Sequence, residues 1–312
     1  MPDAREIVSL GRTSVRVTRL GLGCAPLGNL YSAIEEEEAA ATVEAAWEAG
    51  LRWFDTAPLY GHGLSEERLG RALGAHARED YVLATKVGRL LVPGTDPNTI
   101  FADVPPVRPE YDYSYDGTLR SIEASLDRLG LERIDVAHVH DPDDHETEAM
   151  EGAFRALHRL RDEGVVGAVG AGMNQSAMLA RFVERGVVDC VLVAGRYTIL
   201  DRGAAADLLP AAQAAGVAVI AAGVFNSGLL ADPHPGAKFN YAPAPAEQLR
   251  AAQELKRICE RFGVSLHAAA LQFPLRHEAV VTVLTGARSA AQVAENVRSF
   301  TADIPAELWS AL

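Results

Sequence analysis

The sequence alternates between short apolar runs and helical patterns along nearly its whole length. Successive apolar runs are mostly separated by about 30 residues, which is the length of one strand–helix–strand unit. Several of them, such as 187–195, are apolar almost throughout, as expected for parallel strands covered on both faces. Eight such units predict a closed (β/α)8 barrel. The eight candidate strands begin near Val17, Trp53, Val82, Asp135, Val165, Val187, Gly216 and Val280.

Helical patterns fill the gaps between these runs, and most of them are followed by a glycine, the usual signal at a helix C-terminus. At about 150 residues per domain, 312 residues would suggest two domains, but α/β barrels of this length often form one. We therefore expect a single barrel domain over 1–312. The predicted helices cover 35–49, 65–73, 115–129, 150–163, 175–185, 203–215, 246–262, 266–277 and 289–300.

The alternative architecture is an open, doubly wound sheet that binds a dinucleotide at a Gly-x-Gly-x-x-Gly turn after its first strand. Gly21-Leu22-Gly23 begins that pattern, but Pro26 stands where the third glycine belongs. The missing glycine and the count of eight units both favour the closed barrel.

Two gaps between strands are much longer than the others. They contain 88–113 and 224–245, which are rich in Pro, Gly and Asp. In a barrel, both would lie over the C-terminal ends of the strands, where active sites are found. Before the first strand, 6–17 reads as a β-hairpin that is placed to close the opposite end of the barrel.

Composition excludes several classes of protein. With 48% hydrophobic and 23% charged residues, the chain has the balance of a globular protein and not of a disordered one. A net charge of −13 argues against nucleic acid and anionic membranes as partners. The three widely spaced cysteines suggest buried thiols in a reducing compartment, and residues 1–5 lead into no apolar signal segment. We therefore expect a cytoplasmic protein without a metal; the oligomeric state is not predicted.

Polar residues gather at the ends of three predicted strands. Asp55 ends the second strand and Tyr60 follows it, Lys86 ends the third, and His140 ends the fourth. Taken singly, each has a structural explanation, such as a turn cap, a rim contact or an ion pair. Together they suggest chemistry, because Asp55 would offset the cost of burying Lys86. A lysine cation beside Tyr60 would lower the phenol pKa from about 10 and make it a usable acid or base.

The motifs Phe54-Asp55-Thr56-Ala57-x-x-Tyr60-Gly61 and Ala84-Thr85-Lys86-Val87, with the strand ending at His140, resemble the aldo-keto reductase superfamily. The resemblance extends from about residue 10 to residue 300. It implies a (β/α)8 barrel, a nicotinamide cofactor and a catalytic tetrad. Tyr60 would be the acid or base and Lys86 would tune it. Asp55 would hold Lys86, and His140 would orient the substrate oxygen.

The resemblance also implies where the cofactor binds. Asn174 would hold the nicotinamide carboxamide, although Gly172 stands where the family usually has a serine, and Ala222 stands at the position of the usual stacking aromatic. Phosphate-binding members often have a lysine at Gly286 and an arginine at Gln292, so NAD is favoured over NADP, with Arg288 as the one remaining cation. The cofactor-binding residues implied are Asn174, Gly223, Phe225, Ser227, Gly228, Leu229, Gly286, Arg288, Gln292, Glu295 and Asn296.

Further segments, including Asp112-Tyr113-Ser114 and 223–230, resemble the branch that contains L-fucose dehydrogenase, D-threo-aldose 1-dehydrogenase and pyridoxal 4-dehydrogenase. This resemblance implies oxidation of a sugar hemiacetal to a lactone, with a small sugar or aldehyde as substrate. The alternatives are a general aldehyde or ketone reductase, a cofactor-binding sensor without activity, and a metal-dependent hydrolase. The hydrolase is suggested by His138, His140 and Asp141, and the two histidines could both bind zinc. Lys86 and Asn174 stand where the third and fourth ligands would be needed.

Overall fold

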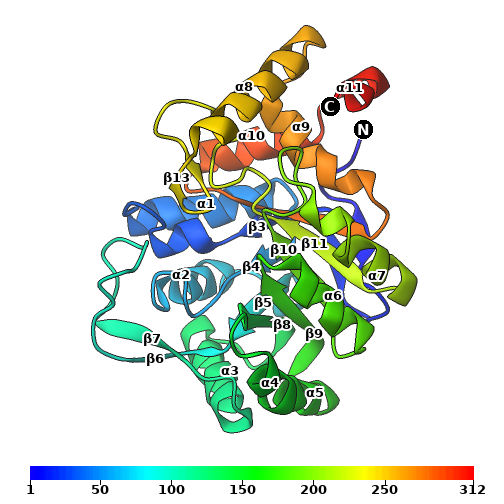
Figure 1. Ribbon diagram of the computed structural model, residues 1–312. Coiled ribbons are helices and arrows are strands. Elements are labelled where there is room, and N and C mark those ends of the chain that lie inside the picture. The colour runs from blue at the N-terminus through cyan, green and yellow to red at the C-terminus, as the bar shows by residue number, and fades with distance from the viewer.

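A computed structural model describes all residues of the chain, 1–312. Eight strands close into a barrel in chain order, and every neighbouring pair is parallel. The helices surround this barrel, and the two termini lie on the same side of it (Figure 1). The predicted (β/α)8 barrel is confirmed. Its strands are β3 (Leu20–Gly23), β4 (Trp53–Asp55), β5 (Val82–Val87), β8 (Ile134–His140), β9 (Val166–Met173), β10 (Cys190–Ala194), β11 (Ala218–Ala222) and β14 (Val280–Gly286).

The helices lie close to the predicted ranges. The apolar faces of these helices pack on the outside of the barrel in one large core. Gly130 and Gly216 end two helices in the left-handed conformation, with φ of 66° and 65°. The helices are α1 (Glu36–Glu48), α2 (Leu64–Leu73), α3 (Tyr115–Leu129), α4 (Glu146–Glu148), α5 (Phe154–Asp162), α6 (Ser176–Glu184), α7 (Leu208–Ala215), α8 (Ala246–Arg261), α9 (Leu266–Gln272), α10 (Ala290–Phe300) and α11 (Ala306–Ala311).

Two predicted helices differ in outline from those observed. The helix expected over 150–163 begins earlier, with α4, and passes through a π-helical turn at Ala149–Ala153 before α5. A Cβ at Gly152 in that turn would collide with the Tyr113 carbonyl oxygen, so the turn packs directly on backbone. The helix expected over 203–215 begins only at Leu208, because the Asp207 side chain accepts a hydrogen bond from the Leu208 amide and caps it there.

The N-terminal hairpin closes the bottom of the barrel. β1 (Ile7–Ser9) pairs antiparallel with β2 (Arg16–Thr18), and the first barrel strand begins only at Leu20, later than predicted. Leu10, Val15 and Val17 belong to a second, smaller core inside the barrel, together with Trp53 and Cys190 at the beginnings of their strands. Val17 therefore belongs to this plug instead of to the barrel wall.

The two long loops carry local structure. The first contains the antiparallel pair β6 (Arg89–Pro93) and β7 (Val107–Tyr111), which extends away from the barrel (Figure 1). The second contains the short pair β12 (Lys238–Phe239) and β13 (Ala242–Pro243). Both loops leave the C-terminal ends of barrel strands, so they border the same mouth.

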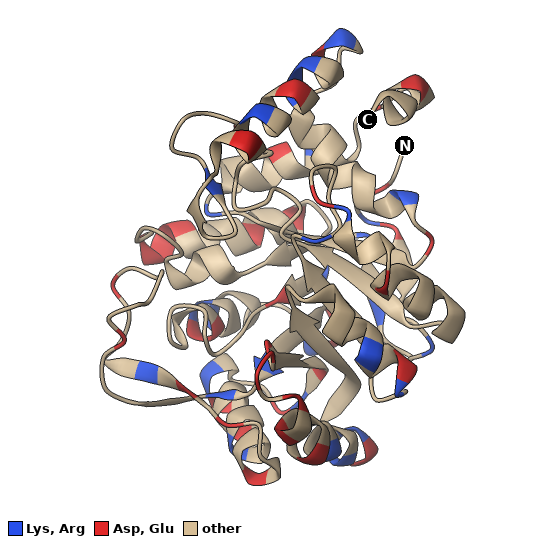
Figure 2. Cartoon of the chain, viewed as in Figure 1, with Lys and Arg blue, Asp and Glu red and all other residues tan.

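Charged residues of both signs are interspersed along the outer helices, while the barrel strands carry few (Figure 2). None of the helices combines the length and the apolar character needed to cross a bilayer.

Candidate active site

Four neighbouring barrel strands bring three of the predicted catalytic residues and the predicted cofactor-binding residue Asn174 to one mouth. Asp55 is the last residue of β4, Lys86 lies one residue before the end of β5, and His140 is the last residue of β8. Asn174 follows directly after β9. Because β4, β5, β8 and β9 are consecutive in the barrel, parallel pairing alone places these side chains together.

Lys86 and Asp55 form a buried ion pair. The Lys86 Nζ donates hydrogen bonds to Asp55 Oδ1 at 2.6 Å and to the Thr56 carbonyl oxygen at 2.8 Å. The two side chains are 1% and 5% exposed. Burial raises the pKa of Asp55, and the adjacent Lys86 ammonium opposes that rise. The expectation that Asp55 holds Lys86 agrees with this geometry.

Tyr60 lies between Lys86 and His140. Lys86 Nζ is 4.8 Å from the centroid of the Tyr60 ring, and the His140 ring meets it edge-on with centroids 6.0 Å apart. The backbone of Tyr60 and Gly61 packs so closely on Gly28 that a Cβ at Gly28 would lie 2.5 Å from the Tyr60 carbonyl carbon. This contact fixes the loop that carries the phenol.

The expected lowering of the Tyr60 pKa is wrong for this structure. Burial raises the pKa of Tyr60 well above its usual value, and the negative charge of Asp55 raises it further. Lys86 faces the aromatic ring while its ammonium is bonded to Asp55 and Thr56, so the pair presents little net positive charge to the phenol. The Tyr60 phenol is therefore protonated near neutral pH.

His140 is held as a neutral ring. Burial lowers its pKa well below the usual value, and the cations Arg89 and Lys86 lower it further. The Tyr113 hydroxyl lies 2.6 Å from the His140 carbonyl oxygen and 2.7 Å from that of Asp141, so it fixes the backbone after β8. A neutral imidazole positioned in this way can donate one hydrogen bond to a substrate oxygen.

The zinc alternative has no support in the geometry around His138. His138 is fully buried, and neither ring nitrogen has a hydrogen-bond partner. Burial lowers its pKa to about 3, and Lys86, its neighbour across the β5–β8 pairing, contributes to that shift. The structure contains no group of three or more His, Cys, Asp or Glu side chains that would hold a metal ion.

Asn174 lies at the mouth beside the tetrad. Its Nδ2 donates to the Ala194 carbonyl oxygen at 2.8 Å. The Oδ1 atom of the same side chain remains available to a ligand. It does not cap the following helix, because the cap position is Gln175, with no side-chain capping bond. A Cβ at Gly172 would lie 3.6 Å from Lys86 Cε, so a small side chain would fit there.

The turn after β11 contains five of the residues implied for cofactor binding. Gly223, Ser227 and Gly228 adopt positive φ angles of 61°, 61° and 103°, so the turn is rich in left-handed residues. Ser227 Oγ accepts a hydrogen bond from the Tyr241 amide at 3.0 Å. Leu229 is fully buried, and Phe225 packs on the His267 ring with centroids 4.4 Å apart. Phe225 is thus part of the packing between the turn and α9.

The Tyr197 ring could replace the aromatic that is missing at Ala222 only if it were open to the mouth, but it is 8% exposed and packs against Phe273 with ring centroids 5.3 Å apart. Core packing is therefore its role in this structure.

The segment after β14 is arranged around the start of α10. Ser289 Oγ accepts a hydrogen bond from the Gln292 amide and caps that helix. The Arg288 guanidinium donates to Ser32 Oγ at 2.5 Å and to the Ala33 carbonyl oxygen at 3.1 Å. Gly286 is exposed, as are Gln292 and Glu295.

Asn296 has a supporting position instead of the ligand-facing one expected. It is 4% exposed, its Nδ2 donates to the Gly286 carbonyl oxygen at 3.3 Å, and its Oδ1 lies 2.8 Å from His267 Nε2. Of the three residues of α10 implied for cofactor binding, Gln292 and Glu295 are the two that are exposed.

A dinucleotide fits this side of the mouth. In the left-handed run 226–228, the Asn226 and Gly228 amides already bond to carbonyl oxygens of the same turn, and the Ser227 amide has no such bond and is available to a phosphate oxygen. The capped N-terminus of the 11-residue helix α10 lies next to Gly286 and provides a second position for negative charge.

The barrel and its Asp–Tyr–Lys–His mouth define a (β/α)8-barrel protein with a buried set of acid and base groups at the C-terminal ends of its strands. Residues 19–312 match the model of the aldo/keto reductase family, and the chain belongs to that family. It is 43% identical to the pyridoxal 4-dehydrogenase of Microbacterium luteolum, over 99% of this chain and 97% of that protein. It is 42% identical to a D-threo-aldose 1-dehydrogenase of Pseudomonas sp., over 95% and 93%.

A third relative is the L-galactose dehydrogenase of Arabidopsis thaliana, 32% identical over 95% of this chain and 88% of that protein. Among solved structures, an aldo-keto reductase from Bacillus halodurans in its holo form superposes with a TM-score of 0.80 at 28% identity, covering 98% and 94% of the two chains. The resemblance to the superfamily and to the branch named above is confirmed.

Sequence reasoning misses three residues of the mouth. Arg89 belongs to none of the motifs, Tyr113 enters only as part of a branch motif, and Asp141 enters only as a potential metal ligand. Two of them carry a local signal, since Arg89 is the first charged residue after β5 and Asp141 directly follows His140. Their mutual contacts depend on how the first long loop folds back, which the sequence does not show.

Proposed function

We propose that this aldo/keto reductase is an NAD-dependent aldose 1-dehydrogenase that oxidises a cyclic sugar hemiacetal to a lactone. The observation that supports this proposal most strongly is the position of Tyr60 at the barrel mouth, between the buried Lys86–Asp55 ion pair and the neutral His140 ring. The names of the D-threo-aldose and L-galactose dehydrogenases support a sugar as substrate. A nicotinamide cofactor, when bound, takes up the hydride that leaves the sugar C1.

The residues divide the remaining work. His140, as a neutral donor, orients the anomeric oxygen. Tyr60, in the phenolate form that is left when its own proton has gone to solvent, receives the proton of that hydroxyl as hydride leaves C1. Lys86 and Asp55 hold Tyr60 through the contact of Lys86 with its ring. The cofactor is bound by Asn174, the 223–229 turn, Gly286, the partly exposed Arg288, and the exposed Gln292 and Glu295, with Asn296 supporting the turn before α10.

NAD is proposed over NADP because positive charge is scarce near the start of α10. Gly286 and Gln292 contribute none, and the Arg288 guanidinium is already bonded to Ser32 and Ala33. A 2′-phosphate would have to compete for Arg288 with these partners. The three cysteines are free and buried, which supports the cytoplasmic location that we propose.

A second candidate is the reduction of a free aldehyde or ketone. It is favoured by the raised pKa of Tyr60, because a neutral phenol donates a proton to a developing alkoxide. The two candidate functions use the same residues, but the reactions run in opposite directions.

An absorbance assay of the reduced cofactor tests both. The enzyme is incubated with NAD or NADP and L-fucose, D-arabinose, L-galactose or pyridoxal, and with NADH and methylglyoxal in the opposite direction. We expect the highest kcat/KM with NAD and a sugar. If methylglyoxal is the only compound turned over, the protein is a reductase and the proposed dehydrogenase activity is wrong. Cofactor binding without any turnover would favour a sensor.

A further inference from the structure

Arg89, Asp141 and His140 form a line of polar groups along the substrate side of the mouth. Arg89 donates a hydrogen bond to Asp141 Oδ2 at 3.0 Å, and the same oxygen lies 3.6 Å from His140 Nε2. The second distance is too long for a hydrogen bond. His140 and Asp141 therefore lie next to each other, and each keeps bonding capacity toward a ligand.

The backbone holds Asp141 in an unusual conformation. Its φ is 43°, in the left-handed region that is costly for residues with a side chain. Its amide donates to the Gly172 carbonyl oxygen at 3.1 Å, and its carbonyl oxygen accepts from the Tyr113 hydroxyl. Two anchors on the main chain thus direct the carboxylate to the site without using the carboxylate itself.

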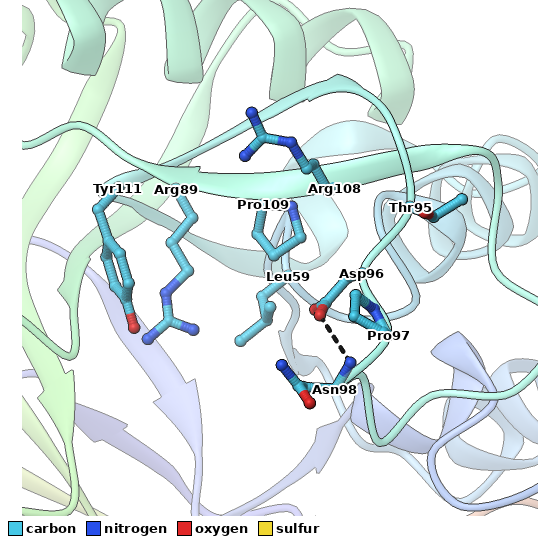
Figure 3. Close-up of a pocket in the computed structure, with 9 residues that line it drawn as sticks. All are labelled: Leu59, Arg89, Thr95, Asp96, Pro97, Asn98, Arg108, Pro109 and Tyr111. Atoms are coloured by element: carbon cyan, nitrogen blue, oxygen red, sulfur yellow. Dashed lines mark hydrogen bonds between the residues drawn. The ribbon is translucent and has the colours of Figure 1, made fainter.

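The surroundings suit a ligand of sugar size. Arg89 and Tyr111 border two cavities at the mouth, and the Arg89 guanidinium lies 5.0 Å from the centroid of the Tyr111 ring (Figure 3). One cavity, of about 260 Å³, is also lined by Asp141 and Asn174. The other, of about 460 Å³, is lined by residues of β6 and β7, by the segment 95–98 between them and by Leu59. The Arg89 and Asp141 side chains are 12% and 27% exposed, so both remain accessible.

The charge balance indicates which ligand these groups recognise. Arg89 is neutralised by Asp141, which makes the pair a poor site for an anion. A carboxylate accepts hydrogen bonds from hydroxyl groups, and a guanidinium donates to them. Neighbouring hydroxyls of a neutral sugar supply both partners, and an unsubstituted aldehyde supplies neither.

We infer that Asp141, held by Arg89, is a specificity-determining residue that binds the hydroxyl next to the reacting carbon and so selects polyhydroxylated hemiacetals. The inference rests on the proposed sugar oxidation, with His140 bonded to the oxygen at C1 and Asp141 to the hydroxyl at C2. The competing role for Asp141 is a structural one, in which it only attaches the β6–β7 hairpin to the barrel.

A matched pair of substrates separates these roles. D-Arabinose and 2-deoxy-D-ribose differ only in the C2 hydroxyl. With NAD, we expect the wild-type kcat/KM to be at least about 10-fold higher for D-arabinose. Asp141→Asn should lower that value about 10- to 100-fold, mainly through KM, as the loss of a charged hydrogen bond predicts. It should change kcat/KM for 2-deoxy-D-ribose less than about threefold, since no bond is lost there.

Asp144→Asn is the control, because Asp144 lines the same cavity and carries the same charge without an ion pair to Arg89. This variant should have nearly the wild-type kcat/KM for both sugars. Asp141→Glu, which keeps the charge but displaces it, should reproduce the selective loss if Asp141→Asn does not fold. NAD affinity, measured by quenching of tryptophan fluorescence, should be unaltered in all three variants.

An equal loss for both sugars, or no loss for either, would overturn the inference and leave sugar oxidation standing. Failure of the wild-type enzyme to oxidise any sugar would overturn the proposed function together with this inference. The two failures are therefore distinguishable.

Discussion

Lys86 Nζ lies 2.6 Å from Asp55 Oδ1 inside the barrel mouth, where neither side chain is accessible to more than a few per cent. Each charge depends on the other, because an unpaired ion at this depth would lose its hydration without compensation. The pair is thus both the support for Tyr60 and a vulnerable point of the fold.

Removing one member should destabilise the protein more than removing both. Lys86→Met is expected to lower the free energy of unfolding by about 3–5 kcal/mol, because it leaves the Asp55 carboxylate uncompensated. The double variant Lys86→Met with Asp55→Asn should recover part of that loss without recovering turnover. Urea unfolding followed by circular dichroism measures both. Equal stability of the two variants would show that the Asp55 carboxylate left by Lys86→Met is not a destabilising buried charge.

Tyr60→Phe should remove the group that exchanges the proton while keeping the ring that packs on Lys86 and His140. We expect kcat to fall by about 10²–10⁴-fold, the usual contribution of general acid–base catalysis. The dissociation constant for NAD should stay within about twofold of wild type, since no ground-state contact with the cofactor is removed. Turnover and cofactor titration check the two parts. Wild-type turnover in this variant would exclude Tyr60 from its proposed role.

The raised pKa of Tyr60 predicts a pH profile. Below that pKa, the phenol is protonated, so the base needed for oxidation grows about tenfold with each pH unit. The kcat/KM for sugar oxidation, which reports the free enzyme, should therefore rise continuously from about pH 6 to about pH 9. His140 should add no break between about pH 5 and pH 8, because its pKa is lowered well below its usual value. A plateau by about pH 7.5 would indicate a low pKa for Tyr60 instead.

Tyr113→Phe tests the support behind His140 and Asp141. The buried hydroxyl serves two carbonyl oxygens, and its loss should lower the free energy of unfolding by about 1–3 kcal/mol. KM for a sugar should rise as the two ligand-facing residues lose their anchor. Tyr115→Phe is the matched control, since the Tyr115 hydroxyl lies near the surface and only accepts a bond from Arg159, and its cost should be below about 0.5 kcal/mol. Similar costs for both variants would count against a special role for Tyr113.

Gly286→Lys should introduce affinity for the 2′-phosphate of NADP. The position is exposed, and the nearest atom to an added Cβ would be Pro26 Cγ, at 3.0 Å. One charge-assisted bond to phosphate should tighten NADP binding about 10-fold, with NAD affinity unchanged. Gly286→Ala controls for the side chain without the charge. Calorimetric titration measures the dissociation constants of NAD and NADP. If the lysine variant binds both cofactors more tightly, the added charge attracts the shared phosphates and does not recognise the 2′-phosphate.

The barrel strands are predictable because each is buried on both faces and reads as a nearly continuous apolar run. Val17 is placed in the wrong strand for the same reason, since a residue plugging the barrel floor is as apolar as one in its wall. The start of the helix at Glu146 escapes the sequence pattern because its π-helical turn depends on the contact of Gly152 with the backbone at Tyr113.

Within the site, the motifs identify Asp55, Tyr60, Lys86 and His140, and their meeting follows from the order of parallel strands. The direction of the Tyr60 pKa shift does not follow. It depends on how deeply the phenol is buried and on which atoms the Lys86 ammonium contacts, and both are properties of the packed site. The burial of Asn296 against His267 likewise does not follow from the sequence, because it depends on the packing of two helices.

The sequence by itself determined the barrel, the family and the chemistry available at the strand ends, because apolar periodicity and residue identity are local properties of the chain. The tertiary structure alone decided that Arg89 reaches Asp141. It also decided that the Tyr113 ring packs on Gly88, whose φ of 107° and missing side chain leave room for it. These contacts join residues that are about 25 to 52 positions apart, and the way a long loop folds back over the mouth is not a local property of its residues.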